Sequence, residues 1–518
     1  MLHLRLDGDG PLHRQTYRAL RDAILAGRLR PGERLTSSRD LAAELGVSRN
    51  TVLQAYDRLV AEGYATTRPA SGTYVADALP ARPAGASSST GARGVTSGAR
   101  ASTGGARSTA GGARGAAARQ RDAHPPTMSA FARRFTEAVP TNRATWSLPR
   151  EPLPYDFRYG EPSYADLPLA TWARLLGRRA RRLSVRRLAY QPPGGAEELR
   201  RALAGYLSRA RAVVCAPEQV LIVRGSQQAI DLTMRLLVDP GDTVVLEEPH
   251  YTGFSFCAAA AGARLVHVPV DEQGLRTSEL GRIRAARLAC VTPSHQFPAG
   301  GVLALPRRLE LLDWARTRSA YVLEDDYDGE FRFAGQPLEC LQALDRDGRV
   351  LYSGTASKIL FPALRIGWLV VPEELLDVFR AALALADTGT ATLEQLAFAD
   401  LIAEGHLERH VRRIRLRHAT RRAALLDAVA RELGSRAELL GESAGLHVLL
   451  RLRELGRRDV TRLRAACRER GVGVYPAAHF YAEPPPYAEL LLGYGSLSER
   501  AIREGIRRLA QALDALGR

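Results

Sequence analysis

A basic stretch without acidic residues divides this chain, so the chain cannot fold as one continuous domain. Residues 78–121 contain seven arginines and are otherwise mostly Ala, Gly, Ser and Thr. Gly-Ala-Arg recurs there every seven residues, but the repeat has no apolar seam and is interrupted by glycine, which argues against a coiled coil. The composition is typical of a flexible tether. We therefore expect a small domain over 1–77, a linker over 78–127 and a larger domain over 128–518.

The composition also excludes several classes of protein. No run approaches roughly 18 consecutive apolar residues and the first residues contain no apolar signal segment, so we expect neither a membrane span nor export. The five cysteines form no CxxC pair and no metal-ligand spacing with histidine, which predicts no metal site and fits a reducing cytoplasm. The formal charge of +17 favours an anionic partner.

The larger domain alternates short apolar runs with helical segments, which indicates a parallel sheet covered on both faces. We expect a large lobe over about 165–405. Long amphipathic helices at 407–432 and 498–516 indicate a smaller α+β lobe over 406–518. The predicted strands are Val220–Val223, Thr243–Leu246, Leu288–Val291, Tyr321–Leu323, Val350–Tyr352 and Ile366–Val371.

The segment SRDLAAELGVSRNTV, residues 38–52, has the spacing of a helix-turn-helix. Ser38 can cap the first helix, Gly46 can form the tight turn, and Ser48 can cap the second helix. A generic pair of surface helices would show the same caps. The pattern continues, however, into two short strands at Tyr64–Thr67 and Thr73–Val75, which predict a wing.

The second helix of this motif is the candidate recognition helix. Arg49, Asn50 and Thr51 would lie in its first turn, which is the part that reaches base edges in the major groove. Ser48 and Thr51 could add bonds to phosphates. Residues 15–75 resemble the winged helix-turn-helix of GntR-type regulators, and the resemblance implies double-stranded DNA contacts from Arg39, Arg49 and the wing around Gly72.

Lys358 is the only lysine in a chain with 72 arginines. It lies in SGTASKILFPALRIGW, directly after a predicted strand, and ligands of α/β sheets bind outside the carboxyl ends of the strands. A neutral lysine amine can condense with an aldehyde, which arginine cannot do because it stays protonated. Arg365 and the hydroxyl of Thr355 could bind a phosphate beside it.

Three further segments follow predicted strands and could serve the same site. GSQQ places Ser226 and Gln227 where backbone amides at a helix start bind anions. One interpretation of the segment EDDYDGEF is a run of acidic residues that caps a helix. The segment also places Asp325 and Tyr327 where a carboxylate could face a pyridine nitrogen and a hydroxyl could donate to a ring oxygen. EEPHY offers Tyr251, whose ring could stack on a planar cofactor.

The order of these motifs resembles that of the fold-type-I aminotransferases, which are α/β proteins. The resemblance implies pyridoxal 5′-phosphate bound as a Schiff base to Lys358, with Asp325 at the pyridine nitrogen, Tyr327 at the phenolic oxygen and Tyr251 against the ring. Tyr190 matches a tyrosine that reaches the phosphate of the neighbouring subunit, which requires a homodimer. The phosphate-binding residues implied on the same subunit are Ser226, Gln227, Thr355 and Arg365.

Two features depart from that family. The usual Asn-Pro turn, whose asparagine bonds the phenolic oxygen, reads PSHQFPAG here, and Gln296 or His295 could take the place of the asparagine. The arginine that binds a substrate carboxylate has no counterpart. Its two candidate positions hold His479 and Leu491, and no arginine occurs between residues 470 and 500, which argues against ordinary amino-acid recognition.

A winged helix-turn-helix joined through a long tether to an aminotransferase-like domain resembles the MocR-type subfamily of GntR regulators. The resemblance implies a cytoplasmic, dimeric transcriptional regulator whose large domain senses pyridoxal phosphate, an amine or an amino acid rather than turning over a substrate. The missing carboxylate arginine favours sensing of the cofactor itself. Two alternatives remain: an active aminotransferase with an autoregulatory DNA-binding head, and a large domain that serves only for dimerisation.

Overall fold

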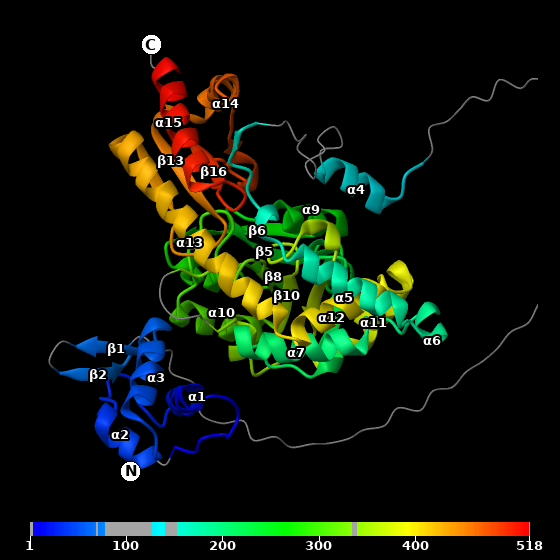
Figure 1. Cartoon of the computed structure of the whole chain (residues 1–518), viewed down its shortest axis with the longest axis vertical. Helices are drawn as coiled ribbons and strands as arrows, with labels where there is room; N and C mark the ends of the chain where they lie inside the picture. The colour runs from blue at the N-terminus through cyan, green and yellow to red at the C-terminus, as the bar shows by residue number, and fades with distance from the viewer. Residues whose placement is uncertain (1–3, 69–70, 78–126, 140–152, 334–338, 517–518) are drawn as a thin grey trace, which may run out of the picture.

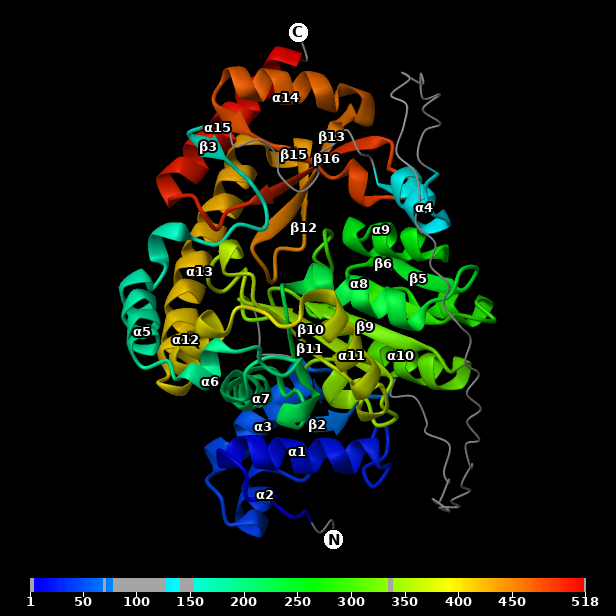
Figure 2. The ribbon, with the colours of Figure 1, turned by 90° about the vertical axis from the view of Figure 1, so that its right-hand side faces the viewer.

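The computed structural model describes residues 4–68, 71–77, 127–139, 153–333 and 339–516. An N-terminal domain, a central α/β lobe and a smaller C-terminal lobe follow one another along the long axis of the molecule (Figures 1 and 2). Nearly all of the predicted linker lies outside the described residues. Within the described ranges, no helix is long and apolar enough to cross a membrane.

The N-terminal domain consists of three helices and a two-stranded wing. Ser48 caps α3 through a 3.1 Å bond from an amide of its first turn, and Gly46 ends α2 in the left-handed conformation (φ 65°), both as predicted. The cap of α2 is Ser37, whose backbone is extended, and the prediction of Ser38 was wrong because Ser38 is already within the helix. The elements are α1 (Leu12–Leu25), α2 (Ser38–Leu45), α3 (Arg49–Ala61), β1 (Ala65–Arg68) and β2 (Gly72–Val75).

The wing and the core complete this domain. The two strands pair antiparallel, with Ala65 opposite Val75 and Arg68 opposite Gly72, so the predicted wing is confirmed. Burial of apolar side chains from the three helices drives their packing. Fully buried core residues are Tyr17, Ala23, Val52, Ala55, Leu59 and Tyr64.

The N-terminal domain is docked on the large lobe. Leu305 and Leu344 of the large lobe extend the apolar core of the N-terminal domain. Glu339, whose side chain is 4% exposed, forms ion pairs with Arg21 of α1 at 2.5 Å and with Arg58 of α3 at 3.5 Å. The docking surface therefore combines apolar burial with a buried carboxylate shared by two guanidinium groups.

An eight-stranded sheet with the order β4-β11-β10-β9-β8-β5-β6-β7 forms the centre of the large lobe. All six predicted strands are present, two of them with the predicted bounds. The strands are β4 (Val220–Val223), β5 (Thr243–Glu248), β6 (Arg264–Asp271), β7 (Gly274–Leu275), β8 (Leu288–Val291), β9 (Tyr321–Asp326), β10 (Val350–Thr355) and β11 (Gly367–Val370).

The prediction of a parallel sheet was wrong at β11, which is antiparallel to both β10 and β4. The connection from β10 to β11 contains only a 3-10 turn at Pro362–Leu364. A parallel return would require a crossover of about a dozen residues or more, usually an α-helix. The sheet is therefore mixed, and this short connection carries Lys358 and Arg365 at the end of β10.

Alternate residues along the strands face opposite layers of helices. Val220 and Ile222 pack with α7 and α12, whereas Leu221 and Val223 pack with α8 and α11. Both faces of the sheet are covered, as predicted. The helices are α5 (Leu169–Arg181), α6 (Val185–Leu188), α7 (Glu197–Arg211), α8 (Ser226–Leu237), α9 (Thr252–Ala261), α10 (Leu305–Arg318), α11 (Leu376–Asp387) and α12 (Thr392–Ala403).

The small lobe is an antiparallel sheet, β12-β13-β16-β15, covered by helices. The two long helices predicted here are confirmed as α13 and α15. α13 joins the lobes, since Ile414 packs with the large lobe and Leu425 with the small one. The elements are α13 (His406–Glu432), β12 (Ala437–Leu440), β13 (His447–Gly456), α14 (Val460–Glu469), β14 (Val472–Gly473), β15 (Tyr475–Pro476), β16 (Tyr487–Gly493) and α15 (Glu499–Leu516).

Two segments ahead of the large lobe also pack on the rest of the domain. α4 (Ala130–Ala138) lies on α9, where Arg134 Nε donates to the carbonyl of Ala260 at 3.1 Å. β3 (Tyr155–Asp156) pairs in parallel with β14. In chain order, β3 therefore contacts the small lobe before the large lobe begins. The segment after β3 runs through the junction between the two lobes.

Candidate functional site

The first candidate site is the exposed first turn of α3. Arg49 and Asn50 are exposed there, and Arg49 Nε donates to Ser38 Oγ at 3.2 Å. The hydroxyl of Thr51 lies 2.8 Å from that of Ser48. An exposed guanidinium and amide at the start of a helix, together with the helix amides, can bind base edges and phosphates.

Two further predicted DNA contacts flank this helix in the sequence. Arg39 is exposed on α2, and Gly72 opens β2 with a φ of 119°, a conformation that favours glycine. A Cβ at Gly72 would lie 3.1 Å from Nε of the exposed Arg34. The guanidinium of Arg34 therefore lies close to the backbone of the wing at Gly72, the position that the sequence analysis predicted to contact DNA.

The second candidate site lies at the carboxyl ends of the central strands, where ligands of α/β sheets bind. Five separate connections meet at this edge, and each contributes residues that the sequence singled out. Gly225–Gln227 follow β4, Tyr251 follows β5, His295 follows β8, Asp325 is the last residue but one of β9, and Lys358 follows β10.

Lys358 is held by a backbone carbonyl. Its Nζ donates to the carbonyl oxygen of Gly160 at 2.6 Å. Burial lowers the pKa of the Lys358 ammonium below its usual value, and the nearby carboxylates of Asp328, Asp325 and Glu161 act in the opposite direction. A larger share of neutral amine is the condition under which lysine acts as a nucleophile.

Asp325 is a buried carboxyl beside this amine. Ser353 Oγ, from the neighbouring strand, donates to its Oδ1 at 3.0 Å. Burial raises the pKa of Asp325 to about 7, although the bond from Ser353 lowers it. A cation placed against this carboxyl would favour its ionised form, which is the arrangement that a protonated pyridine nitrogen requires.

The start of α8 and the segment before β11 form a cradle for an anion. Gly225 takes a φ of 93° at the N-cap of α8, and a Cβ there would lie 3.3 Å from Nη1 of Arg365. Arg365 also bonds the carbonyl of Arg224. Ser226 begins the helix, and Thr355 Oγ1 accepts the amide of Ser357 at 3.1 Å. A phosphate at a helix start beside a guanidinium is well matched to this geometry.

Tyr251 is oriented by Gln227. Its hydroxyl donates to Gln227 Oε1 at 3.2 Å, and its ring packs edge-on against Phe297 with centroids 6.0 Å apart. The side chain of Gln227 is thus occupied with Tyr251, and any contact of this residue with a phosphate would have to come from its backbone.

His295, and not Gln296, reaches the hydroxyl of Tyr327. Nδ1 of His295 lies 2.9 Å from Tyr327 Oη and 3.0 Å from Asp328 Oδ2. The side-chain amide of Gln296 is used by other groups: Nε2 donates to the carbonyl of Pro249, in the loop after β5, at 2.7 Å, and Oε1 accepts from the amide of Ala299 at 3.0 Å. Of the two residues left open by the sequence, His295 is the one beside the tyrosine.

The expected place for a carboxylate-binding arginine is apolar. Leu491 is buried in a cluster with Phe297 and Phe480, whose ring centroids lie 4.8 Å apart. His479 is exposed, with its ring 3.8 Å from that of Phe480. The small lobe therefore presents an aromatic wall where a substrate carboxylate would require a cation.

The side chain of Tyr190 is 88% exposed, in the segment that precedes α7.

Sequence reasoning missed four residues of this site. Gly160 holds the lysine, Asp328 bonds His295, and Phe297 packs on Tyr251. His447 lies 5.0 Å from His295 between ring centroids, and atoms of His295, Asp328 and His447 that could bind a metal lie within 4.8 Å of one another. Asp328 and Phe297 stood inside motifs already singled out, but no sequence signal marked Gly160 or His447.

The residues present fit pyridoxal phosphate. The structure brings together a buried amine, a buried carboxyl, a hydroxyl-bearing ring and an anion cradle that a Cβ at Gly225 would crowd. These are the partners that an aldehyde, a protonated pyridine nitrogen, a phenolic oxygen and a phosphate would each need.

Comparison with known families gives two matches along the chain. Residues 12–75 match the bacterial regulatory proteins of the gntR family, and residues 156–508 match aminotransferase class I and II. The probable rhizopine catabolism regulatory protein MocR of Rhizobium meliloti is 38% identical over 100% of this chain and 96% of its own length. The pyridoxine biosynthesis transcriptional regulator PdxR of Corynebacterium glutamicum is 28% identical over 96% of this chain and 95% of its own length.

Solved aminotransferases match about three quarters of the chain. The kynurenine aminotransferase of Pyrococcus horikoshii is 26% identical with a TM-score of 0.66, over 76% of this chain and 96% of its own. The α-aminoadipate aminotransferase LysN of Thermus thermophilus is 29% identical with a TM-score of 0.64, over 75% of this chain and 95% of its own.

Proposed function

We propose a function from the premise that this chain belongs to the MocR-type branch of the gntR family, in which a winged helix-turn-helix is joined to a class I and II aminotransferase domain. The chain is a DNA-binding transcriptional regulator. We propose that its aminotransferase-like domain binds pyridoxal 5′-phosphate at Lys358 and that occupancy of this site changes how two DNA-binding heads engage an operator in the cytoplasm.

One observation carries this proposal. The only lysine of the chain stands at the ends of the central strands, with its pKa lowered by burial and its Nζ held 2.6 Å from the carbonyl of Gly160. Pyridoxal phosphate, when bound, supplies an aldehyde that an amine can attack and a ring that withdraws electrons. No other side chain of this protein has an amine to offer.

The remaining residues have separate tasks in this proposal. Asp325 would hold a proton on the pyridine nitrogen, Tyr327 would bond the phenolic oxygen, and Tyr251 would lie against the ring. His295 keeps the hydroxyl of Tyr327 in place through its 2.9 Å contact. The phosphate would be bound by Ser226, the backbone of Gln227, Thr355 and Arg365.

We propose that the effector is the cofactor itself. The apolar wall around Phe480 and Leu491 offers no cation to an amino-acid carboxylate, whereas every group needed for the cofactor is present. A relative that is 28% identical is named as a regulator of pyridoxine biosynthesis, which is in keeping with this effector. The relative at 38% identity is named for rhizopine catabolism, so an amine effector is the alternative to test beside it.

We also propose a homodimer. Tyr190 is 88% exposed in its own subunit. Its position in the segment before α7 would let it reach the phosphate of the partner, as its resemblance to the aminotransferases implies. A ligand can then shift DNA binding because it binds two dimer arrangements with different affinities.

An active aminotransferase with an autoregulatory DNA-binding head is the second candidate function. It is favoured by one observation: Lys358 and Asp325 are both in place with the groups that set their pKa values. Sustained conversion of an amino donor and a 2-oxo acid by the purified chain would support it, and a single stoichiometric reaction would not.

Borohydride reduction tests the proposed site. The chain is incubated with pyridoxal phosphate, reduced and digested, and the labelled peptide is identified by mass spectrometry. We expect one label, on Lys358, and visible absorbance before reduction. Lys358→Arg is the matched control, because it keeps the positive charge but forms no imine. A colourless wild type, or equal labelling of the variant, would overturn the assignment.

A further inference from the structure

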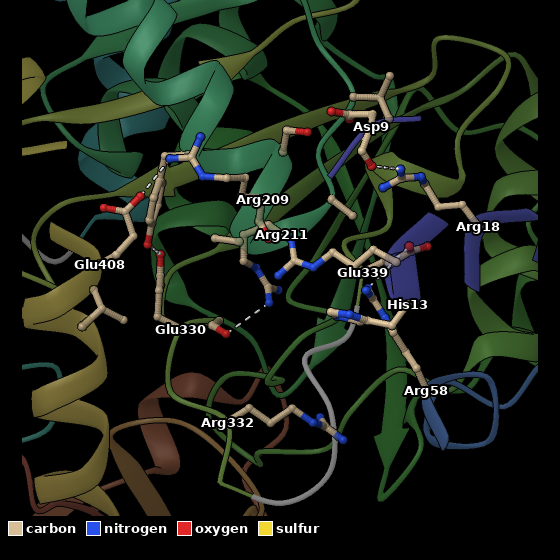
Figure 3. A pocket seen from close by; sticks show the side chains of 18 of the residues that line it. Asp9, His13, Arg18, Arg58, Arg209, Arg211, Glu330, Arg332, Glu339 and Glu408 are labelled. Carbon is tan, nitrogen blue, oxygen red and sulfur yellow. Dashed lines mark hydrogen bonds and ion pairs between the residues drawn. The ribbon is translucent and has the colours of Figure 1, made fainter. Parts of the chain in front are cut away.

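A cavity of about 630 Å³ lies between the N-terminal domain and the aminotransferase-like domain. It is bounded by α1 and α3 on one side and by α7, α13 and the segment after β9 on the other. Figure 3 shows side chains from both domains pointing into it, among them His13 and Arg58 on one side and Arg209, Arg211 and Arg332 on the other. Its volume is in the range of small-molecule sites.

The wall of this cavity has an excess of positive charge. Nine arginines and four acidic residues line it. Five of the arginines have a carboxylate partner, as in the pairs of Arg18 with Asp7 at 2.6 Å and of Arg211 with Asp326 at 2.6 Å. Among the described residues, the other four form no ion pair. These four are Arg14, Arg332, Arg412 and Arg415.

Arg332 shows the imbalance most clearly. Its Nε and Nη1 are buried and have no hydrogen-bond partner among the described residues. Burial, together with the charges of Arg308 and Arg211, lowers the pKa of its guanidinium. A guanidinium buried without an anion is costly, because it has lost water and gained no counter-charge.

Arg14 faces the same cavity from α1. Burial lowers the pKa of its guanidinium, and so do the charges of Arg58, Arg18 and Arg209. Its Nη1 donates to the carbonyl of Arg209 at 2.8 Å, which is a contact between the two domains and brings no negative charge. Arginines without an ion pair among the described residues thus line the cavity from both domains.

We propose that this cavity binds a small, phosphate-bearing anion that bridges Arg14 of the N-terminal domain and Arg332 of the aminotransferase-like domain. Guanidinium groups bind phosphate oxygens in pairs and with directional bonds. Several unpaired cations in one cavity suit an anion with more than one charge. The site is separate from Lys358, and a bound anion stabilises the docked arrangement, because only that arrangement brings both domains to it.

Pyrophosphate titration of the full chain tests the proposal. Binding is measured by calorimetry at constant ionic strength in sodium chloride, without DNA. We expect one saturable site in the wild type and roughly tenfold or greater weakening in Arg332→Gln and in Arg14→Gln, the loss expected for a charge-assisted bond. Arg458→Gln, an exposed arginine of the small lobe, is the matched control and should bind as the wild type does.

A second measurement separates an anion site from a structural role. Without pyrophosphate, Arg332→Gln should unfold at the same temperature as the wild type or higher, since an unpaired buried charge has been removed. With pyrophosphate, the wild type should gain thermal stability and this variant should not. Binding that survives Arg332→Gln but is lost in Arg365→Gln would place the anion in the cofactor cradle and overturn the proposal, as would the absence of saturable binding.

Discussion

Lys358 Nζ donates a hydrogen bond to the carbonyl of Gly160 at 2.6 Å and so joins two residues that are 198 positions apart. Gly160 lies just after β3, the strand that pairs with the small lobe. It takes a φ of 74°, and a Cβ there would lie 3.0 Å from Nζ. The place of the amine therefore depends on a glycine at the junction of the two lobes.

Gly160→Ala should weaken uptake of pyridoxal phosphate roughly tenfold. The left-handed conformation costs a residue with a Cβ about 1–2 kcal/mol, and the added methyl group would displace the amine. The measurement is a titration of visible absorbance with the cofactor. Gly241→Ala is the control, because Gly241 has a φ of 94° and an added Cβ would meet nothing within 4 Å. Equal loss in both variants would contradict the role of the Gly160 contact.

The free energy of unfolding of the cofactor-free protein should fall as the pH rises from 5 to 8. Burial raises the pKa of Asp325 to about 7, so the folded state holds this proton above the pH at which the unfolded carboxyl, with its ordinary value of 3.8, has lost it. Stability is therefore lost as the pH rises towards 7. Asp325 alone should account for about 2.5 kcal/mol of this loss at about 1.4 kcal/mol per pKa unit.

Urea unfolding followed by circular dichroism at the two pH values measures this effect. Asp325→Asn should reduce the difference in free energy, and Asp377→Asn, at an exposed position of α11, should leave it unchanged. Saturating pyridoxal phosphate should also reduce the difference in the wild type, since a protonated ring nitrogen stabilises the carboxylate. The same pH dependence in all three proteins would be inconsistent with a buried, protonated Asp325.

Arg49→Ala should weaken specific DNA binding by roughly fivefold to 150-fold and leave cofactor uptake intact. Arg49 is exposed in the first turn of α3, and its Nε donates to Ser38 Oγ within the N-terminal domain. Loss of a bidentate base contact costs about 1–3 kcal/mol of discrimination. Electrophoretic mobility shift with duplexes selected by the wild type measures it, with Arg28→Ala as the exposed control in the same domain. A parallel loss of cofactor uptake would mean that the two domains are not separable.

Glu339→Gln should loosen the docking of the N-terminal domain. The change removes the carboxylate shared by Arg21 and Arg58, although each guanidinium keeps a second partner, Asp22 or Glu62. We expect a loss of about 1–3 kcal/mol, as for a buried group left partly unsatisfied. Hydrogen exchange in α1 and α3 should become faster, whereas Asp57→Asn, at an exposed position of α3, should not change it.

The sequence predicted the local features that depend on short-range patterns. Four apolar residues between turns were enough for β4 and β8, and a serine before an amphipathic helix was enough for the cap of α3. The direction of β11 was predicted wrongly, because a strand's own residues do not record which neighbour it pairs with. The cap of α2 was misplaced by one residue because two adjacent serines offer the same hydroxyl.

The candidate site was predicted only in part, because the sequence shows local patterns and not which distant segments meet. Lys358 could be found because the rest of the chain uses arginine, and Asp325 because it ends an apolar strand. Gly160 and His447 come from segments far away in the sequence and reach the site only through the packing of the two lobes. His295 and Gln296 are neighbours in one loop. Only their hydrogen bonds in the folded protein show that His295 is the one beside the hydroxyl of Tyr327.

The central claim is that occupancy of Lys358 governs DNA engagement. Its most direct test is the affinity of the purified chain for a selected operator duplex, with and without pyridoxal phosphate at constant salt, in the wild type and in Lys358→Arg. We predict that the cofactor changes the affinity of the wild type at least severalfold and leaves that of the variant unchanged. An equal response of the two proteins, or no response in the wild type, would contradict the account.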